Sequence, residues 1–244
     1  MRNILAFIAL VLSLIGFSQE YKEVENSTVI MEFDKLSKKY QAANFQMTYN
    51  KKIYRDSIDI DPMVETKGFI TKGQNFQYRM EEKGAIVIQN EHLKMTVDSA
   101  SQLVTIGRPD SLFKTIDIRA FMDKKAFDTY TFKRIEYKGV IHYLIVSKNR
   151  LEGITELWIN AKDFSLQKLV LSLPKANYFN ESLEDETLES PLVVIIYQPL
   201  KSLDMNALSK QFSQDDWLVN ENTKYSLQLS KGMFKLHDLR YNPY

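Results

Sequence analysis

Hydrophobic positions follow a helical period between residues 29 and 40, at the start of the predicted domain. Four of them lie three or four residues apart: Val29, Phe33, Leu36 and Tyr40. This spacing places them on one face of a helix, and charged residues occupy the other faces. Asn26 and Ser27 form a typical helix cap before them. The pattern predicts an amphipathic helix of about four turns with one apolar side to bury.

From Ala43 onward the period changes to two, which is typical of β-strands. Phe45, Met47 and Tyr49 alternate with polar residues, and short polar turns separate the later apolar runs. Because strands follow one another without helices between them, we expect an antiparallel sheet. The predicted strands are 43–49 with 51–55 as its continuation, 65–71, 75–81, 85–88, 93–97, 102–106, 129–137, 140–147, 154–160, 166–173, 192–197, 225–229 and 233–236.

Three segments interrupt this series of strands. Residues 112–125 are apolar without a regular period and predict one or two short helices. Residues 177–190 are acidic and predict a solvated loop, with binding of calcium or of a basic partner as the alternative. Residues 207–212 predict a short helical or irregular piece. With no Gly/Ser/Pro linker in the chain, 19–244 is interpreted as a single domain.

The N-terminus has the layout of a secretory signal peptide. Arg2 supplies a positive charge, an apolar run extends from Ile4 to Ile15, and the small residues Gly16 and Ser18 precede a cut before Gln19. We therefore expect residues 1–18 to be a cleaved signal and the domain to be exported, to the periplasm in preference to the extracellular medium. An uncleaved membrane anchor is the alternative. The chain has no cysteine, which excludes acylation of a cysteine at the new N-terminus.

Charge balance and composition limit the classes of partner. Removal of Arg2 with the signal leaves 31 basic and 31 acidic side chains. A neutral balance argues against a general nucleic-acid binder and against simple electrostatic docking on anionic lipid. Without cysteines there are no disulfides, thiolate metal sites or cysteine nucleophiles.

A search for catalytic or metal-binding patterns finds little. His92, His142 and His237 are scattered and have no metal-ligand spacing, although a zinc site built from distant residues stays open. Asp59 and Asp61 resemble the start of a calcium loop, but Pro62 breaks that pattern and a turn is favoured. We expect a protein that is not an enzyme and that binds no cofactor and no metal. An unrecognised hydrolase is the alternative.

Large apolar side chains are abundant on the predicted strands. A curved sheet that turned them inward could use them as an ordinary core or as the lining of an apolar cavity for a lipid tail, where Met and aromatic side chains adapt well. Composition does not separate the two. The candidate lipid-binding residues are Phe45, Met47, Phe69, Phe76, Tyr78, Met80, Met95, Phe132 and Trp158.

The order of these elements resembles the LolA/LolB family of periplasmic lipoprotein carriers and receptors. The helix leads to an aromatic strand and then to short motifs in the order of the family series, which is "G-x-hydrophobic", "F-x-aromatic" and "hydrophobic-x-D-G". In this chain they read K-G-F-I-T-K (67–72), N-F-Q-Y-R-M (75–80), A-I-V-I-Q-N (85–90), L-K-M-T-V-D (93–98), Y-T-F (130–132), Y-L-I-V (143–146), E-L-W-I-N (156–160) and F-S-L-Q-K-L (164–169). The likeness covers residues 27–198.

This resemblance implies a mainly β fold, a half-open barrel of curved antiparallel sheet that covers the N-terminal helix and a central helical lid. The lid residues would be Ile116, Ile118, Phe121 and Met122. Two departures are clear: Gly73-Gln74 stands where carriers of the family often have Arg-Pro, and Asn90-Glu91 replaces an Asp-Gly turn. A lid mechanism that uses the family arginine is therefore not expected here.

The function that the resemblance implies is transfer of acyl chains towards the outer membrane inside an apolar cavity. The partners would be a lipidated protein or another lipid, an inner-membrane release machinery and an outer-membrane receptor. A chain without an acylated cysteine favours the diffusing carrier over the tethered receptor. The alternative from another class is a structural or protein-interaction domain of the same fold, with a filled core and no lipid.

Overall fold

The fold was analysed in a computed structural model of the 244-residue chain. The structure describes residues 20–41, 44–74, 77–109, 127, 129–148, 154–172, 191–204, 208, 210–221 and 224–240. The predicted signal (1–18), the predicted lid (116–125) and the acidic segment (177–190) lie outside the described residues.

One long α-helix, α2 (Asn26–Gln41), is present in the described part of the chain. The four residues of the predicted helical face are at most 1% exposed, so the prediction of an amphipathic helix is confirmed. At the helix start the carbonyl of Glu25, one residue before the predicted cap, accepts hydrogen bonds from the amides of Thr28 and Val29. At the other end the buried ammonium of Lys72 donates to the carbonyls of Tyr40 (2.6 Å) and Gln41 (3.1 Å). A cation on these carbonyls satisfies acceptors that have no partner within the helix.

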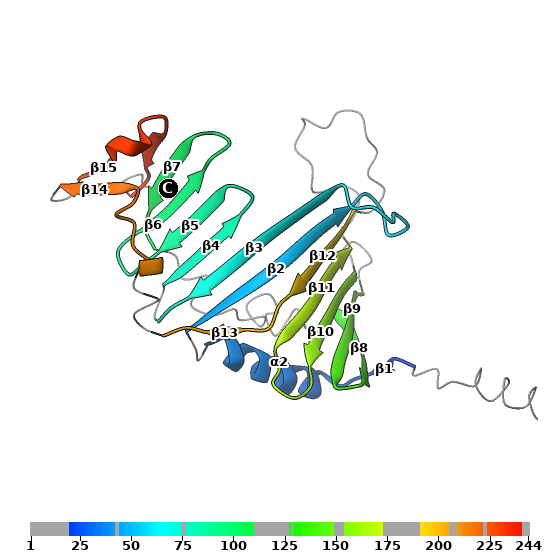
Figure 1. The fold of residues 1–244 in the computed structure, drawn as a ribbon. Coiled ribbons are helices and arrows are strands. Elements are labelled where there is room, and N and C mark those ends of the chain that lie inside the picture. Colours follow the sequence, from blue (N-terminus) through cyan, green and yellow to red (C-terminus); the bar gives the residue numbers. More distant parts are fainter. Residues whose placement is uncertain are drawn as a thin grey trace, which may run out of the picture.

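Fourteen strands form one large, curved sheet that does not close into a barrel (Figure 1). Every pairing is antiparallel except that of β16 with β7. The spatial order is β1-β8-β9-β10-β11-β12-β2-β3-β4-β5-β6-β7-β16, with β13 beside β2, and β14 and β15 form a separate hairpin. The first eight strands are β1 (Lys22–Glu23), β2 (Phe45–Tyr54), β3 (Val64–Lys72), β4 (Tyr78–Glu82), β5 (Ala85–Gln89), β6 (Lys94–Asp98), β7 (Leu103–Gly107) and β8 (Tyr130–Tyr137). The others are β9 (Val140–Ser147), β10 (Ile154–Asn160), β11 (Leu166–Ser172), β12 (Leu192–Tyr197), β13 (Lys201–Ser202), β14 (Leu218–Glu221), β15 (Lys224–Leu227) and β16 (Lys235–Asp238).

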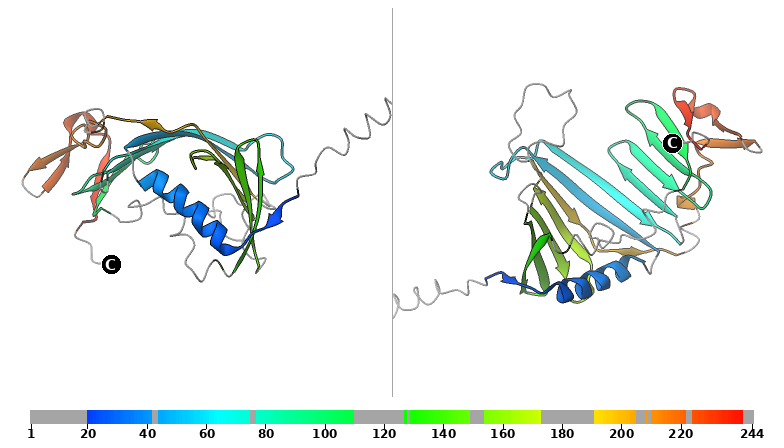
Figure 2. Two further views of the ribbon diagram at one scale, coloured as in Figure 1. Left: turned by 90° about the horizontal axis from the view of Figure 1, so that it is seen from below. Right: turned by 180° about the vertical axis from the view of Figure 1, so that it is seen from behind.

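Helix α2 lies inside the curve of the sheet, beneath β8–β10 and the start of β2 (Figure 2). Its apolar side packs there with buried residues of these strands to form the first core, which we call the helix core. We call the face of the sheet that carries α2 the concave face and the opposite face the convex face. The members of the helix core are Val29, Phe33, Leu36, Tyr40, Phe45, Met47, Phe127, Phe132, Ile141, Tyr143, Ile145, Leu157 and Ile159.

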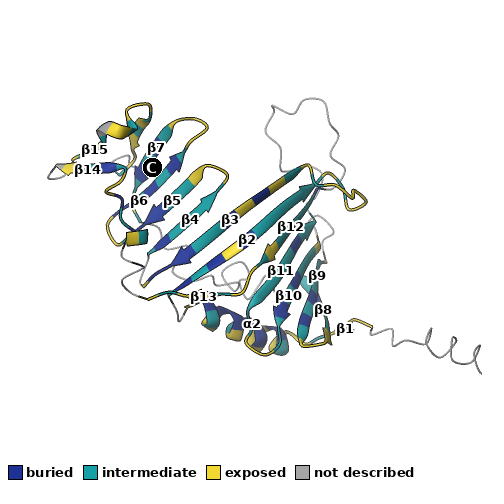
Figure 3. Ribbon diagram, viewed as in Figure 1, coloured by how far each residue is buried: buried dark blue, intermediate teal, exposed yellow. Residues whose placement is uncertain are grey.

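A second core lies at the other end of the sheet, on the convex face, where the chain after Leu200 returns. This segment contributes Leu218 and the half-buried Trp217 and Phe234, and β16 adds to the edge of β7. We call this cluster the tail core, and Figure 3 shows the buried positions along β5–β7. Its buried members are Ile88, Leu93, Met95, Val97, Val104, Ile106 and Leu218. The tail thus completes a hydrophobic core of the fold.

The mainly β, antiparallel fold class is confirmed, and the strands 140–147, 154–160 and 192–197 are observed with these bounds. The short strands β1, β13 and β14 were not predicted. Two of them have only two residues each, too few for a hydrophobic period to be visible. The parallel partner of β7 was also not expected, since its pairing depends on the path of the tail around the sheet.

Candidate functional site

The concave face is the place where a lipid-binding surface was expected. Register assigns each side chain to a face, because directly paired residues of neighbouring strands point to the same side and successive residues alternate. Phe45, Met47, Tyr78, Met80 and Phe132 all point to the concave face by this criterion. Three of them, Phe45, Met47 and Phe132, are packed against α2 and are at most 3% exposed. Tyr78 is also buried, and Met80 is half-buried.

The other described candidates were expected to point inward, and this expectation is wrong. Met95 is paired with Ile88 and Ile106 on the convex face and belongs to the tail core. Phe69 pairs with Thr48 and Glu81, one position out of phase with Met47. A period of two defines two faces of a strand but does not say which is concave. Here the tail supplies a second apolar surface that the convex face can bury.

Trp158 is the third candidate on the convex face, where its indole stacks on the imidazole of His142 with ring centroids 3.8 Å apart. The ammonium of Lys168 lies 4.3 Å from the centroid of the Trp158 ring. Phe76 lies outside the described residues, as do the lid residues. The structure therefore divides the candidate set between two faces and does not bring it together in one site.

A different set of apolar residues lies on the concave face beyond the helix core. Direct pairing joins them into one line across β11, β12, β2 and β3, and all four are half-buried. We call them the apolar row: Leu171, Val193, Ile53 and Val64. Sequence reasoning missed the row because β12 reads L-V-V-I-I-Y, in which both faces are apolar and no alternation marks the concave one.

Polar side chains occupy the concave face beside the row. The Glu82 carboxylate accepts hydrogen bonds from the hydroxyls of Tyr49 (2.6 Å) and Thr66 (3.0 Å) and forms an ion pair with Lys51. Burial alone raises the pKa of Glu82, but the bonds from Lys51, Tyr49 and Thr66 outweigh it and hold that pKa below its usual value. Burial and the bond to Glu82 raise the pKa of Tyr49. The charges here are paired with one another, so the row is not bordered by an isolated ion.

Gly68 allows this arrangement. The ring of Tyr49 lies over it, and a Cβ atom at residue 68 would come within 2.4 Å of the Tyr49 ring and 2.8 Å of the Glu81 carbonyl oxygen. Only a residue without a side chain permits so close an approach. Gly68 thus leaves room for the Tyr49 ring, whose hydroxyl is bonded to Glu82.

His142 lies on the convex face, beside Trp158, between two polar side chains. The hydroxyl of Tyr21 lies 2.7 Å from Nδ1 of His142, and Nε2 lies 2.9 Å from the carboxylate of Glu156. A carboxylate only accepts, so Nε2 carries the proton and Nδ1 of the neutral ring accepts from Tyr21. Burial, supported by the charge of Lys168, lowers the pKa of His142 although Glu156 opposes the shift.

This histidine predicts a pH dependence of stability. Its folded-state pKa is below the unfolded value of about 6.5, so the unfolded chain binds more protons in the window between the two values. The free energy of unfolding should therefore fall as the pH is lowered through this window. In His142→Gln this part of the decrease should be absent, while the exposed control His92→Gln keeps it. Urea midpoints measured from pH 7.5 down to pH 5 test this, and equal slopes in all three proteins would contradict it.

Within the described residues no group of three or more His, Asp or Glu side chains is arranged to hold a metal ion. A search of the same residues finds no helix with the length and apolar character needed to cross a membrane.

Among known proteins, this chain is similar only to solved structures. No family model matches the chain, and no curated protein matches it. A LolA superfamily protein from Nitrosomonas europaea is 11% identical, with 79% of this chain and 99% of that chain covered and a TM-score of 0.34. A putative outer membrane lipoprotein-sorting protein domain from Vibrio parahaemolyticus is 10% identical, with 75% and 95% covered and a TM-score of 0.30.

The Pseudomonas aeruginosa MucA/MucB complex also matches, at 10% identity and a TM-score of 0.47, with 73% of this chain and 59% of that chain covered. Solved structures of LolA type are therefore among those to which this chain is similar, as the sequence resemblance indicated. Similarity of this degree concerns the path of the chain.

Proposed function

We propose that this protein is a periplasmic carrier that binds the acyl chains of lipoproteins, or other lipids, on the concave face of its sheet. The observation that carries the proposal is the apolar row. Its four side chains form an uninterrupted line across four strands and stay half-buried, whereas the apolar residues beneath α2 are packed. An acyl chain laid along the row would bury further apolar surface, at about 0.8 kcal/mol for each CH₂ group removed from water.

The surroundings of the row suit an acyl chain. At its β11 end the row is followed on the same face by Leu169, at the edge of the helix core. Near its β3 end the polar group at Glu82 is internally paired and presents no uncompensated charge. A carrier of this kind acts by binding alone and needs no catalytic residue. Export through a signal at residues 1–18 would place it where lipidated proteins must cross an aqueous space.

Native mass spectrometry of the exported protein, before and after delipidation, tests the proposal. We expect adducts with the masses of acylated species that delipidation removes and that return when a long-chain fatty acid is added. The mass of the protein itself also shows whether the chain begins at Gln19. A protein that neither carries nor takes up an acyl ligand would overturn the proposal.

Two adjacent residues of β12 offer a matched pair of variants. Val193 belongs to the apolar row, while Val194 points to the convex face, and both are half-buried. Val193→Gln places an amide in the proposed path of the chain, and we expect affinity for a fluorescent C16 fatty acid to fall about tenfold. Val194→Gln should bind as the unchanged protein does. Fluorescence titration of both variants checks this. An equal loss of affinity in the two would mean that the fatty acid does not bind on the concave face.

A second candidate function is favoured by a different observation. Phe45, Met47 and Phe132, expected to line a cavity, are instead packed against α2. A filled core of this kind also suits a structural or protein-interaction domain without a lipid. The same mass spectra distinguish the two functions, since this domain would show no acyl adduct under any condition.

A further inference from the structure

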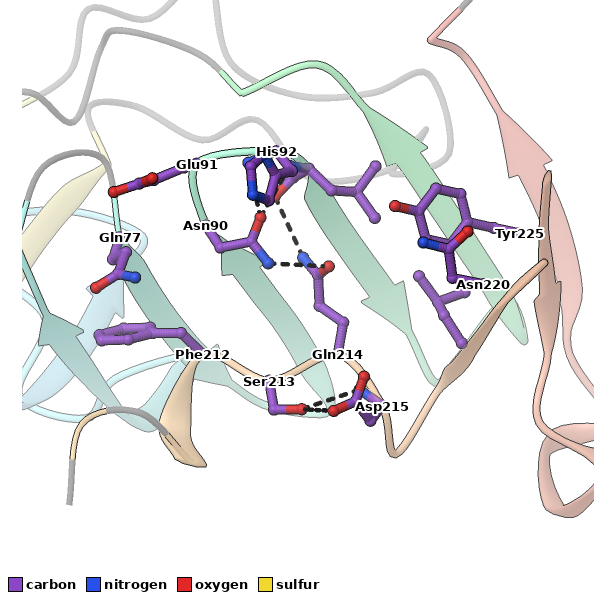
Figure 4. Close-up of a pocket in the computed structure, with 12 residues that line it drawn as sticks. Gln77, Asn90, Glu91, His92, Phe212, Ser213, Gln214, Asp215, Asn220 and Tyr225 are labelled. Atoms are coloured by element: carbon purple, nitrogen blue, oxygen red, sulfur yellow. Dashed lines mark hydrogen bonds between the residues drawn. The ribbon is translucent and has the colours of Figure 1, made fainter. Parts of the chain in front are cut away.

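A cavity that the carrier function does not use lies between the tail and the sheet (Figure 4). It is bounded by the turn between β5 and β6, by the chain at 212–215 and by the hairpin β14–β15. Its volume is about 450 Å³, within the range of about 300–1,000 Å³ that is common for small-molecule sites. It belongs to the side of the sheet that bears the tail core, so its lining is distinct from the apolar row.

The base of the cavity is apolar and fixed. Leu93, Phe212 and Leu218 line it and are at most 5% exposed, and Leu93 and Leu218 are members of the tail core. A base made of core residues keeps its shape when no ligand is bound. A preformed site of this kind loses little conformational entropy on binding.

Two amide side chains hold the walls of the cavity in place. Asn90 Oδ1 accepts from the backbone amides of His92 and Leu93, both at 2.9 Å, and its Nδ2 donates to Gln214 Oε1 at 3.3 Å. The Nε2 group of Gln214 donates to the carbonyls of Ile88 (3.3 Å) and Leu93 (3.2 Å). These bonds join the tail to the β5–β6 turn.

Four other polar groups around the cavity have no hydrogen-bond partner within the described part of the chain. They are neutral or weakly basic and include both donors and acceptors. The groups are the Gln77 amide, the His92 imidazole, the Asn220 amide and the Tyr225 hydroxyl. The ring of Tyr225 packs against the tail core, and the guanidinium of Arg240 lies 4.5 Å from its centroid, so the aromatic surface of the cavity is supplied by Phe212.

The charge of the lining restricts the ligand. Among the lining residues that the structure describes there is no Lys or Arg, whereas two are carboxylates, Glu91 and Asp215, which disfavours an anion. Asp215 already accepts a hydrogen bond from the Ser213 hydroxyl at 2.7 Å, which reduces its availability for a cation. The uncommitted groups are therefore mainly neutral dipoles that can both donate and accept.

We infer that this cavity binds a neutral sugar of one or two pyranose units. Ring hydroxyls pair with amide, imidazole and phenol groups, while the C–H face of a pyranose ring packs on an aromatic side chain and on an apolar base. Such a ligand matches the four uncommitted groups and requires no counter-ion. The cavity is open to solvent on one side, so we expect a dissociation constant on the order of 1 mM.

Chemical-shift titration of the ¹⁵N-labelled full domain tests this inference with defined probes. The sugar probes are glucose, galactose, mannose, N-acetylglucosamine, maltose and lactose, while choline serves as an organic cation and inorganic phosphate as an anion. We expect at least one sugar to give saturable shifts at the side-chain amides of Gln77 and Asn220. Neither choline nor phosphate should do so.

Variants connect the binding to the cavity. Asn220→Ala and Gln77→Ala should each weaken sugar binding about three- to tenfold, as expected for loss of one hydrogen bond. Gln198→Ala removes an exposed amide away from the cavity and should leave it unchanged. Binding of choline or phosphate in preference to sugar, sugar binding that both cavity variants retain, or no binding of any sugar probe would each overturn the inference.

Discussion

Arg134→Met should lower the free energy of unfolding by about 3 kcal/mol, because it leaves the carboxylate of Glu32 with one hydrogen bond in place of three. Glu32 lies on α2, is 7% exposed and receives two bonds from the Arg134 guanidinium at 3.0 and 3.1 Å. The Tyr143 hydroxyl donates to the same carboxylate at 2.6 Å, and burial raises the pKa of this tyrosine. Urea unfolding followed by circular dichroism measures the change.

Two controls distinguish a lost ion pair from a general disturbance of β8. Lys133→Met changes an exposed neighbour on the other face of the strand and should alter stability by less than about 0.5 kcal/mol. The double variant Glu32→Met/Arg134→Met removes both charges and should recover most of the loss, since no unpaired charge then remains buried. If the double variant is as unstable as Arg134→Met, the buried charge is not the cause.

Removal of the tail has the largest expected effect of all. A chain that ends at Leu203 lacks Trp217, Leu218 and Phe234, and it therefore exposes the convex face of β5–β7, including Met95 and other apolar residues. It also uncovers the edge of β7 that β16 now pairs with. Exposed apolar surface and a free strand edge both promote association. In size-exclusion chromatography we expect aggregates or oligomers of the shortened chain and a single narrow peak for the full domain.

A point substitution tests the same core in a chain that can still fold. Leu218 is 5% exposed, and Leu218→Ala should cost about 2–5 kcal/mol through the cavity that it creates. Ile60→Ala is the matched control, because this isoleucine is 91% exposed and buries nothing. Equal urea midpoints for the two variants would mean that the tail only rests on the sheet.

The helix illustrates what can be predicted from local pattern. Its four predicted apolar positions are all buried, because one side of an amphipathic helix has a single surface to meet. The prediction that charged residues lie on the other faces is wrong for Glu32, which is buried as well because it pairs with Arg134. The ions at the C-terminal end and at the centre of the helix were not predictable. Lys72 and Arg134 lie far from α2 in sequence, and nothing in their own neighbourhoods marks them as partners of Gln41 or Glu32.

The strands show what the hydrophobic pattern does not predict. Most strand positions follow from alternation and turn residues, and so does the antiparallel class of the sheet. The face of each side chain does not, because alternation is the same for both faces. Met47 and Met95 occur in similar strand patterns, yet one contacts α2 and the other contacts the tail. The helix covers one face of the sheet and the tail covers the other. Which face each of them covers depends on the path of the whole chain.

A helix with one buried side, a series of antiparallel strands and the absence of cysteine chemistry follow from the amino-acid sequence alone, since each depends on neighbours a few residues away or on composition. The residues of the apolar row, the ions that hold α2 and the cavity beside the tail follow only from the assembled fold. These features depend on register and on contacts between residues more than 100 positions apart, such as Glu32 with Tyr143 and Asn90 with Gln214. Contacts between residues so far apart leave no local sequence pattern, because they form only when the sheet is assembled.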